Sequence, residues 1–171
     1  MKKQTLTLTC LSVFSAIILC GCYTKDINEI NRLREIEEPA LKCPQLITYL
    51  NRRPFLTRNP ARLAQEALVE CKSAALPFLK AQMHKDGRHN DRARALMLEA
   101  RVEILGRGTV KLLVDIAIDA QETPKQRATA LDLLRKLNAH LAAPTAENLY
   151  LDETQPKTVR KAAERAWKAL K

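Results

Sequence analysis

The residues best suited to chemistry stand near the start of the chain, where a short apolar run ends at Cys22. Gly21, directly before it, has no side chain, so another protein's backbone, such as that of a peptidase, can approach closely. A cysteine thiolate is a strong nucleophile that can form a thioether bond. Together with Leu19 and Cys20, these residues favour a cleavage site followed by a covalently modified cysteine.

The segment that must position these residues has the organisation of a secretory signal peptide. Lys2 and Lys3 supply a positively charged start, and residues 6–19 are mostly apolar. This run is shorter than the roughly 20 residues that a membrane-spanning helix needs, but it suits the apolar core of a signal peptide. We therefore predict a signal peptide over residues 1–21. The alternatives are an uncleaved signal anchor and a secreted protein with a chance cysteine.

The run Leu19-Cys20-Gly21-Cys22 resembles the lipobox of bacterial lipoproteins, in which an aliphatic residue and two small residues precede a lipidated cysteine. Cys20 departs from the alanine or serine that is more familiar at its position. The resemblance implies a covalent lipid on Cys22, a membrane as a partner, and no other cofactor. Tyr23, rather than an aspartate, follows Cys22. In Gram-negative lipoproteins this implies sorting to the outer membrane, facing the periplasm.

The composition predicts an all-α fold. The chain has 171 residues with only 4 glycines and 4% aromatic residues, while the helix formers Ala, Leu, Arg and Glu are abundant. The part after the signal peptide is long enough for one domain with a buried core. The formal net charge is +10. Export argues against nucleic acid and favours an anionic envelope polymer, a lipid headgroup or an acidic protein face as the partner.

Two parts follow the expected signal peptide. Residues 22–42 hold the lipidated N-terminus and a short amphipathic helix that is expected to end near Pro39. The apolar side chains of this helix recur at every third position: Ile27, Ile30, Leu33 and Ile36. The helix is predicted either to act as a tether or to dock on the main domain. Residues 43–171 form that domain.

Apolar spacing, prolines and glycines divide the main domain into helices joined by short turns. The predicted helices are Pro44–Asn51, Pro60–Cys71, Ala74–His84, Asp91–Leu105, Val110–Ile118, Lys125–Leu141, Pro144–Tyr150 and Pro156–Leu170. Pro44 is expected at a first helical position, Gly106 as a C-cap and Thr109 as an N-cap. The helix Val110–Ile118 is apolar on most sides, which predicts a central position in the fold.

A repeat is visible among the second helices of successive pairs. Similar stretches surround Arg92, Arg127 and Arg160, which stand at nearly equal intervals along the chain. Periods of roughly 20–50 residues, with two helices in each unit, are typical of α-solenoids. The pattern, clearest at Val159–Ala163, resembles the HEAT-repeat family over residues 73–171, with a degenerate pair at 44–71. The resemblance implies a short α-solenoid of antiparallel helix pairs that binds protein partners and performs no catalysis.

Cys43 and Cys71 remain once the signal peptide and Cys22 are set aside. An oxidising periplasm favours their pairing. In an antiparallel hairpin, the start of the helix Pro44–Asn51 lies beside the end of the helix Pro60–Cys71. The two Cα atoms could then approach the roughly 5.5 Å that a disulfide spans. We predict a Cys43–Cys71 disulfide, with two buried thiols as the alternative.

No group of residues in the sequence has the composition and spacing of a catalytic or metal site. The candidates for such a site are His84, His89 and His140, the carboxylates Glu99 and Glu103, and the turn Gly106–Thr109. The histidines and carboxylates are expected to be solvated or structural, and the turn lacks the rest of a phosphate-binding loop. We therefore predict a protein that is not an enzyme and that has neither a metal nor a small-molecule substrate.

The last predicted helix is strongly basic. Its candidate surface for an anionic partner consists of Lys157, Arg160, Lys161, Arg165 and Lys168. The alternative is a polar cap, because the end of a solenoid must stay soluble. Trp167, on the apolar side of the same helix, is expected in the core.

These observations predict a membrane-anchored lipoprotein that acts as a non-catalytic, protein-binding adaptor or scaffold in the cell envelope. Small helical-repeat lipoproteins often assist the assembly of outer-membrane machines, as the pilotins of secretin channels do. The alternative is a protein that binds an anionic envelope polymer, either peptidoglycan or lipopolysaccharide, through its basic surface.

Overall fold

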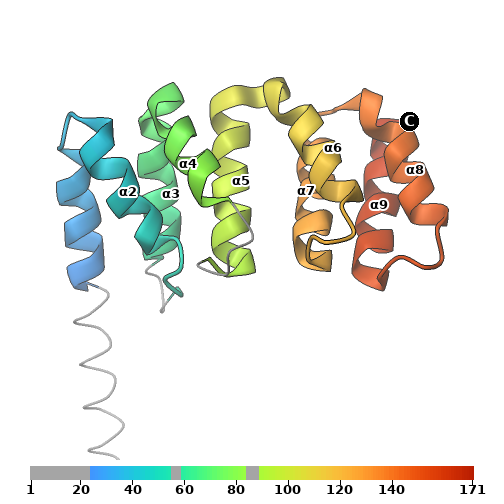
Figure 1. Cartoon of the computed structure of the whole chain (residues 1–171), viewed down its shortest axis with the longest axis horizontal. Helices are drawn as coiled ribbons and strands as arrows, with labels where there is room; N and C mark the ends of the chain where they lie inside the picture. Colours follow the sequence, from blue (N-terminus) through green and yellow to red (C-terminus); the bar gives the residue numbers. More distant parts are fainter. Residues whose placement is uncertain (1–23, 55–58, 84–88) are drawn as a thin grey trace, which may run out of the picture.

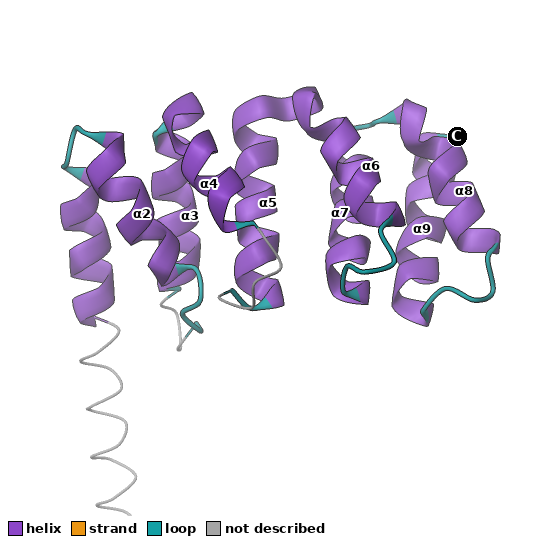
Figure 2. Cartoon of the chain, in the orientation of Figure 1, coloured by secondary structure: helices purple, strands orange, loops and turns teal. Residues whose placement is uncertain are grey.

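The computed structural model of the chain describes residues 24–54, 59–83 and 89–171. Every regular element in these ranges is helical, which confirms the predicted all-α class (Figure 2). The expected signal peptide, Cys22 and Tyr23 lie outside the described residues.

A helix over residues 24–34 comes first. The helices that follow are α2 (Pro39–Tyr49), α3 (Pro60–Glu70), α4 (Leu76–Gln82), α5 (Asp91–Leu105), α6 (Val110–Ile118), α7 (Pro124–Lys136), α8 (Ala143–Leu151) and α9 (Lys157–Leu170). Short 3₁₀ turns lead into α4, α6 and α8: Lys72–Ala75, Gly106–Thr109 and His140–Ala142.

These helices form two rows (Figure 1). In one row α3, α5, α7 and α9 follow one another, each in contact with the next. In the other row α2, α4, α6 and α8 pack on α3, α5, α7 and α9 in turn. The helices α3, α5, α7 and α9 all begin at the lower edge in the view of Figure 1.

The last three pairs repeat at an equal interval along the chain. The N-caps of α5, α7 and α9 are Asn90, Thr123 and Pro156, and the second is as far from the first as the third is from the second. We call this separation the repeat interval. Counted from these N-caps, Arg94 is the residue equivalent to Arg127 and Arg160. The sequence alignment on Arg92 was therefore wrong, because its stretch offers two arginines and only the position of the N-cap distinguishes them.

Arg127, a buried arginine of α7, joins its helix pair to the following one. Arg127 is 4% exposed. Its Nε donates to the backbone carbonyl of Ala117 at the end of α6 (2.8 Å), and its Nη2 donates to Gln155 Oε1 before α9 (2.7 Å). One side chain therefore ties α7 both to its own partner helix and to the loop of the following pair.

The equivalent arginines form these bonds at equivalent places. Arg160 Nε donates to the Tyr150 carbonyl (3.3 Å), which stands one repeat interval after Ala117. Arg94 Nη2 donates to both carboxylate oxygens of Glu122 (2.9 Å each), which stands one repeat interval before Gln155. Equivalent hydrogen bonds thus accompany the equal spacing of these helices.

Replacing Arg127 with methionine is expected to lower the free energy of unfolding by about 1–3 kcal/mol, because the buried Ala117 carbonyl loses its side-chain donor. The midpoint of urea unfolding measures the effect. Arg107→Met, at an exposed position in the turn before α6, is the matched control and should change stability by about 0.5 kcal/mol or less. Equal midpoints for the wild type and Arg127→Met would contradict the assignment.

The core lies between the two rows and continues into the first helix. Ile30 and Leu33 are fully buried among side chains of α2 and α3, including Leu46 and Leu68. The described part of the first helix is therefore docked on the domain, which was one of the two expectations for it. The boundary expected between residues 42 and 43 falls inside α2.

Two ends of the helices predicted in the main domain were wrong by more than two residues, and the first is the start of α2. Pro39, rather than Pro44, occupies the first helical position, and Pro44 lies inside the helix. Both prolines satisfy the local preference of a helix start. The extra turn places Cys43 on the buried face of α2 with Leu46 and Ile47. Burial of this apolar surface stabilises the longer helix, and local sequence preference does not reveal it.

The second is the end of α7, which was expected at Leu141. Asn138 adopts a left-handed backbone conformation with φ 48°, which asparagine tolerates better than most residues. The Asn138 N–H donates to the Arg135 carbonyl and the Ala139 N–H to the Leu134 carbonyl, both at 3.1 Å. These two bonds close the helix. Leu141 lies beyond it and is 92% exposed.

The bounds predicted for α6 are confirmed, but two other expectations for it are not. Gly106 ends α5 at φ 54°, as expected for a C-cap glycine. Thr109 stands at the N-cap position, but its hydroxyl caps no helix N–H and donates instead to the Gly106 carbonyl (2.7 Å). The helix is not central either: Leu113 and Ala117 are its buried side chains, and Ile118 is 53% exposed.

Candidate functional site

A basic groove lies between the first halves of α7 and α9. It is a hollow of about 430 Å³. Its lining residues are Lys125, Ala128, Thr129, Asp132, Lys157, Thr158, Lys161 and Arg165. Four of them are cations and one is a carboxylate, so the groove carries an excess of positive charge.

Helix geometry adds to this charge. The N-terminal end of a helix carries roughly half a positive charge, and acidic side chains are favoured there. In α7 and α9, which are both described in full, the first turn holds no acidic residue. Lys125 and Lys157 occupy these turns instead, and Pro156 gives α9 no side-chain cap. Such lysines oppose helix stability, each by about 0.3–1 kcal/mol at exposed positions.

One ion pair crosses the groove. Arg165 Nη2 lies 3.0 and 3.1 Å from the two carboxylate oxygens of Asp132. A similar pair joins α3 to α5, where Arg62 lies 2.6 Å from Glu99. Such partly exposed pairs contribute at most about 1 kcal/mol to stability. The pair between Arg165 and Asp132 therefore belongs to the contacts between neighbouring helices.

Three lysines line the groove besides Arg165. Lys125, Lys157 and Lys161 form no ion pair with any residue in the described ranges. They come from two helices and line one hollow. Their mutual repulsion is relieved when an anion binds between them, so the groove is a candidate site for a negatively charged ligand.

Only three of the five residues predicted as the surface for an anionic partner line the groove. Lys157, Lys161 and Arg165 line the groove, whereas Arg160 donates to the Tyr150 carbonyl and Lys168 donates to Glu164 at 2.6 Å. The hydrogen bond between Lys168 and Glu164 raises the pKa of the lysine and lowers the pKa of the glutamate. Arg160 and Lys168 are therefore not part of the candidate site.

Sequence reasoning missed the contribution of α7. Lys125, Thr129 and Asp132 line the groove, and none was selected from the sequence. A usable signal existed, because Asp132 stands one repeat interval before Arg165 and therefore occupies the same place in the preceding repeat. This signal becomes usable only after the helices are aligned by their N-caps, which the structure provides.

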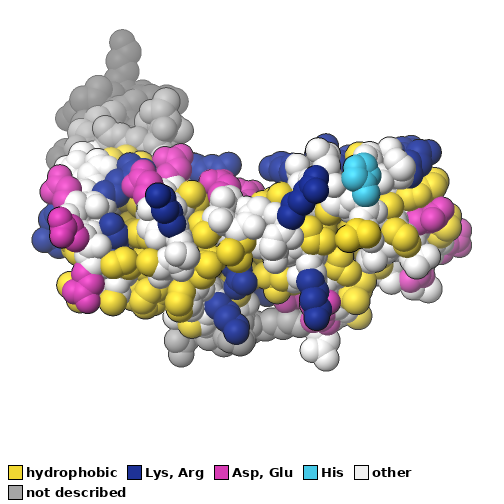
Figure 3. All heavy atoms as spheres, turned by 90° about the horizontal axis from the view of Figure 1, so that it is seen from above, with side chains coloured by type: hydrophobic (Ala, Val, Ile, Leu, Met, Phe, Trp, Pro, Cys, Tyr) yellow, Lys and Arg dark blue, Asp and Glu magenta, His cyan; other side chains and the backbone are white. Residues whose placement is uncertain are grey.

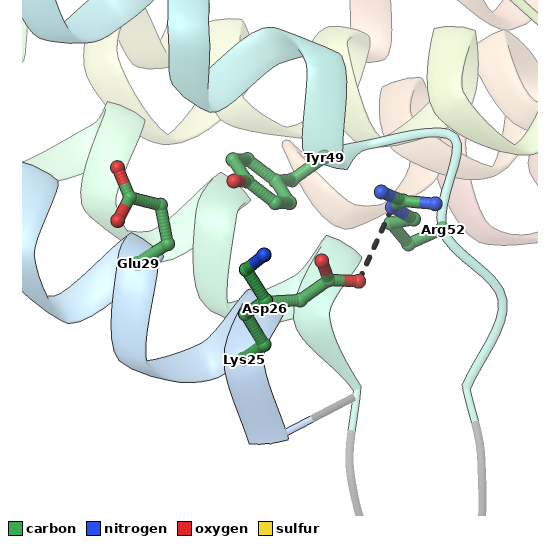
Figure 4. A pocket seen from close by; sticks show the side chains of 5 residues that line it. All are labelled: Lys25, Asp26, Glu29, Tyr49 and Arg52. Atoms are coloured by element: carbon green, nitrogen blue, oxygen red, sulfur yellow. Dashed lines mark ion pairs between the residues drawn. The ribbon is translucent and has the colours of Figure 1, made fainter. Parts of the chain in front are cut away.

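A second hollow, of about 460 Å³, lies at the other end of the molecule (Figure 4). It is lined by Lys25, Asp26 and Glu29 of the first helix and by Tyr49 and Arg52. Arg52 Nε lies 3.2 Å from Asp26 Oδ2. Burial, and then the nearby carboxylates of Glu29 and Asp26, raise the pKa of Tyr49. With two cations facing two carboxylates, this hollow has no excess charge to attract an ion.

Figure 3 views the molecule from above and shows the face opposite the edge where α7 and α9 begin. There the Lys and Arg side chains stand apart, among hydrophobic and acidic ones. The N-terminal ends of α7 and α9 lie at the opposite edge. The clustering of three unpaired lysines therefore distinguishes the groove from this upper face.

Cys43 and Cys71 lie together where α2 packs on α3, and both are free thiols in the structure. Cys43 is buried and Cys71 is half-buried. Burial, followed by the hydrogen bond with Cys71, raises the pKa of the Cys43 thiol to about 12. The predicted proximity is therefore present, while the disulfide itself stays a prediction.

The other aromatic and histidine side chains in the described ranges have structural partners. Trp167 stacks on Tyr150 with 5.6 Å between ring centroids and is half-buried. His140 Nδ1 lies 2.7 Å from the Leu170 carbonyl at the end of α9. His89 lies 2.9 Å from the Asn51 amide, and His84 lies outside the described residues.

The described residues contain no cluster of three or more His, Cys, Asp or Glu side chains that could hold a metal ion. They also contain no helix with the length and hydrophobicity needed to cross a bilayer. In comparisons with known proteins, no family model, curated protein or solved structure matches the chain.

Proposed function

We propose that the chain is a lipid-anchored protein of the cell envelope that binds a protein partner and performs no catalysis. One observation carries the proposal: the N-caps of α5, α7 and α9 are equally spaced, and the equivalent arginines Arg127 and Arg160 each donate to a carbonyl of the preceding helix. Repeated helix pairs build extended surfaces on which partner proteins bind. The row of second helices, with a basic groove between α7 and α9, is proposed as a surface of this kind.

The same repeat supports a HEAT-like α-solenoid as the finer description of the fold. In a solenoid each unit contacts its neighbours in sequence, and stability comes from within the units and from the interfaces between them. The bonds of Arg94 and Arg127 to the loop of the following pair are interface contacts of this type. On this proposal the region 73–171 forms regular units and α2 with α3 form a degenerate one.

The proposed anchor is a lipid on Cys22. The described part of the first helix begins two positions later, at the lower edge of the molecule in Figure 1, where α3, α5, α7 and α9 also begin. An anchor so close to the folded domain keeps this edge near the bilayer. The proposed location is the periplasmic face of the outer membrane, where the chain assists the assembly of an outer-membrane machine.

A second candidate is supported by the groove between α7 and α9. Its unpaired lysines also suit an anionic envelope polymer, either peptidoglycan or lipopolysaccharide. Salt separates the two candidates, because binding that depends on exposed lysines weakens as the screening length falls from about 10 Å at 0.1 M salt to about 3 Å at 1 M. A protein interface with a buried apolar centre keeps more of its affinity.

Affinity capture from solubilised envelope membranes tests the adaptor proposal. Tagged wild type is expected to enrich one envelope protein, and Cys22→Ala should recover much less of it because the chain no longer resides at the membrane. Quantitative mass spectrometry measures the ratio. Recovery of muropeptides or lipopolysaccharide without a protein would favour the second candidate, and recovery of none of these would contradict both.

A further inference from the structure

We propose that the groove between α7 and α9 binds an acidic peptide segment of the partner protein, with the peptide carboxylates paired to Lys157 and Lys161. The inference rests on the proposed function, since it names the part of the partner that the adaptor holds. Its basis is the set of three lysines that line one hollow and form no ion pair with a residue in the described ranges.

The contacts available in the groove suit carboxylates. Arg165 already holds the carboxylate of Asp132 through Nη2 at 3.0 and 3.1 Å, so the groove contains an example of the interaction that we propose. Thr158, in the first turn of α9, adds a hydroxyl donor beside Lys157 and Lys161. A short acidic segment therefore finds both ionic and neutral donors along α9.

The same residues argue against a densely charged polymer. Asp132 places a negative charge inside the groove, and it repels a chain of closely spaced phosphates more than it repels a peptide with separated carboxylates. None of the described lining residues is aromatic. The groove therefore lacks the flat side chains on which nucleic-acid bases stack.

The edge around the groove argues against a flat layer of lipid headgroups. The loops that lead into α7 and α9 carry Asp119, Asp152 and Glu153. These loops lie at the edge where α7 and α9 begin. An anionic bilayer pressed against this edge meets carboxylates as well as lysines, whereas a narrow peptide can lie in the groove and avoid them.

Fluorescence anisotropy on the full wild-type chain in detergent tests the inference. The probe is a labelled twelve-residue peptide of repeating glutamate, glycine and serine, and its control has glutamine in place of glutamate. We expect the glutamate peptide to bind at least about tenfold more tightly than the glutamine peptide. Binding should weaken as salt rises from about 0.1 M to about 1 M.

Substitutions in the groove test whether the glutamate peptide binds there. Lys157→Gln/Lys161→Gln is expected to weaken binding of the glutamate peptide about tenfold. The matched control Lys111→Gln/Lys136→Gln removes the same charge from exposed positions outside the groove and should stay within about twofold of the wild type. Asp132→Asn removes the carboxylate inside the groove and should tighten binding about threefold. Circular dichroism checks that each variant keeps its helices.

Three results would overturn the inference. The first is an equal loss of affinity in the groove variant and the matched control, which would mean diffuse attraction by net charge. The second is failure of the glutamate peptide to bind. The third is groove-dependent binding of lipopolysaccharide, or of vesicles rich in anionic phospholipid, at concentrations where the peptide does not bind.

Failure here is distinguishable from failure of the proposed function. The assay uses detergent-solubilised protein, so its result does not depend on whether Cys22 carries a lipid. If capture from envelope membranes yields a protein partner while the glutamate peptide fails to bind, the adaptor proposal stands and the groove assignment falls. If the glutamate peptide binds in the groove and no partner protein is captured, the groove assignment stands and the adaptor proposal falls.

Discussion

Cells that express Cys22→Ala are expected to accumulate the chain outside the membrane fraction, whereas wild-type protein sediments with membranes. Labelled palmitate should enter the wild type and not the variant. Each buried CH₂ of an acyl chain contributes about 0.8 kcal/mol, and more than one chain is needed for stable anchoring. On the proposal that Cys22 carries the lipid, the substitution removes the whole anchor, and fractionation followed by immunoblotting measures the loss.

The neighbouring cysteine provides the matched control for this experiment. Cys20→Ala replaces one small residue by another in the expected signal peptide, two positions before Cys22. The variant should be processed, labelled and sedimented like the wild type. Label in Cys22→Ala, or wild-type protein that stays in the soluble fraction, would remove the lipid anchor from the account.

The second large effect is expected at Cys43 and Cys71. Protein from an oxidising compartment should contain a disulfide between them, because the two thiols already lie together and Cys43 is fully buried. Closing the loop between α2 and α3 is expected to stabilise the fold by about 3–4 kcal/mol in the chain-entropy model. Reduction should then lower the melting temperature by roughly 10 °C, as measured by circular dichroism with and without dithiothreitol.

The pH dependence of stability gives a second readout of the same pair. In the reduced protein the pKa of Cys43 is raised from 9.0 to about 12. Below pH 9 the thiol is protonated in both the folded and the unfolded chain, so its contribution to stability is fully present. Between about pH 9 and 12 the unfolded thiol ionises first, and the reduced protein loses stability. The oxidised protein has no thiol at this position and should not show this loss.

Cys71→Ser separates the bond from other effects of the reductant. The variant cannot form the disulfide, so it should melt near the reduced wild type, and dithiothreitol should leave its melting temperature unchanged. Mass spectrometry after alkylation counts the thiols directly. Two alkylated cysteines at these positions in native periplasmic protein, without prior reduction, would show that no disulfide forms.

The sequence predicted most helices because local signals mark their ends. The bounds of α5 and α6 were predicted as they stand in the structure, and the prolines that precede or begin α3, α7 and α9 placed those helices to within one residue at their start. Proline and an N-cap side chain act within one turn of the chain. Such signals need no knowledge of the rest of the fold.

The wrong predictions concern choices that depend on the neighbours of an element. The residues around Pro39 and Pro44 give no local signal that decides which proline starts α2. The helix begins at Pro39, which allows Cys43 and Leu46 to be buried on the same face. Similarly, the apolar sequence of α6 suggested a central helix. The helix lies in the row that carries the shorter helices, and Ile118 remains exposed.

The candidate groove was only partly predictable for the same reason. The sequence identified Lys157, Lys161 and Arg165 as a basic stripe on one helix, but it could not show that α7 contributes Lys125 and Asp132 to the same hollow. Nor could it separate these cations from Arg160 and Lys168, which have partners elsewhere. Which side chains meet depends on how neighbouring helices pack.

The sequence by itself thus determined the helical class and most helix boundaries, because these follow from spacing and capping within a few residues. Only the tertiary structure decided that Arg94, rather than Arg92, is equivalent to Arg127, and that α7 and α9 meet around the groove. Contacts such as those of Arg127 with Gln155 and of Arg165 with Asp132 join segments far apart in the chain. Their geometry exists only once the rows of helices have packed.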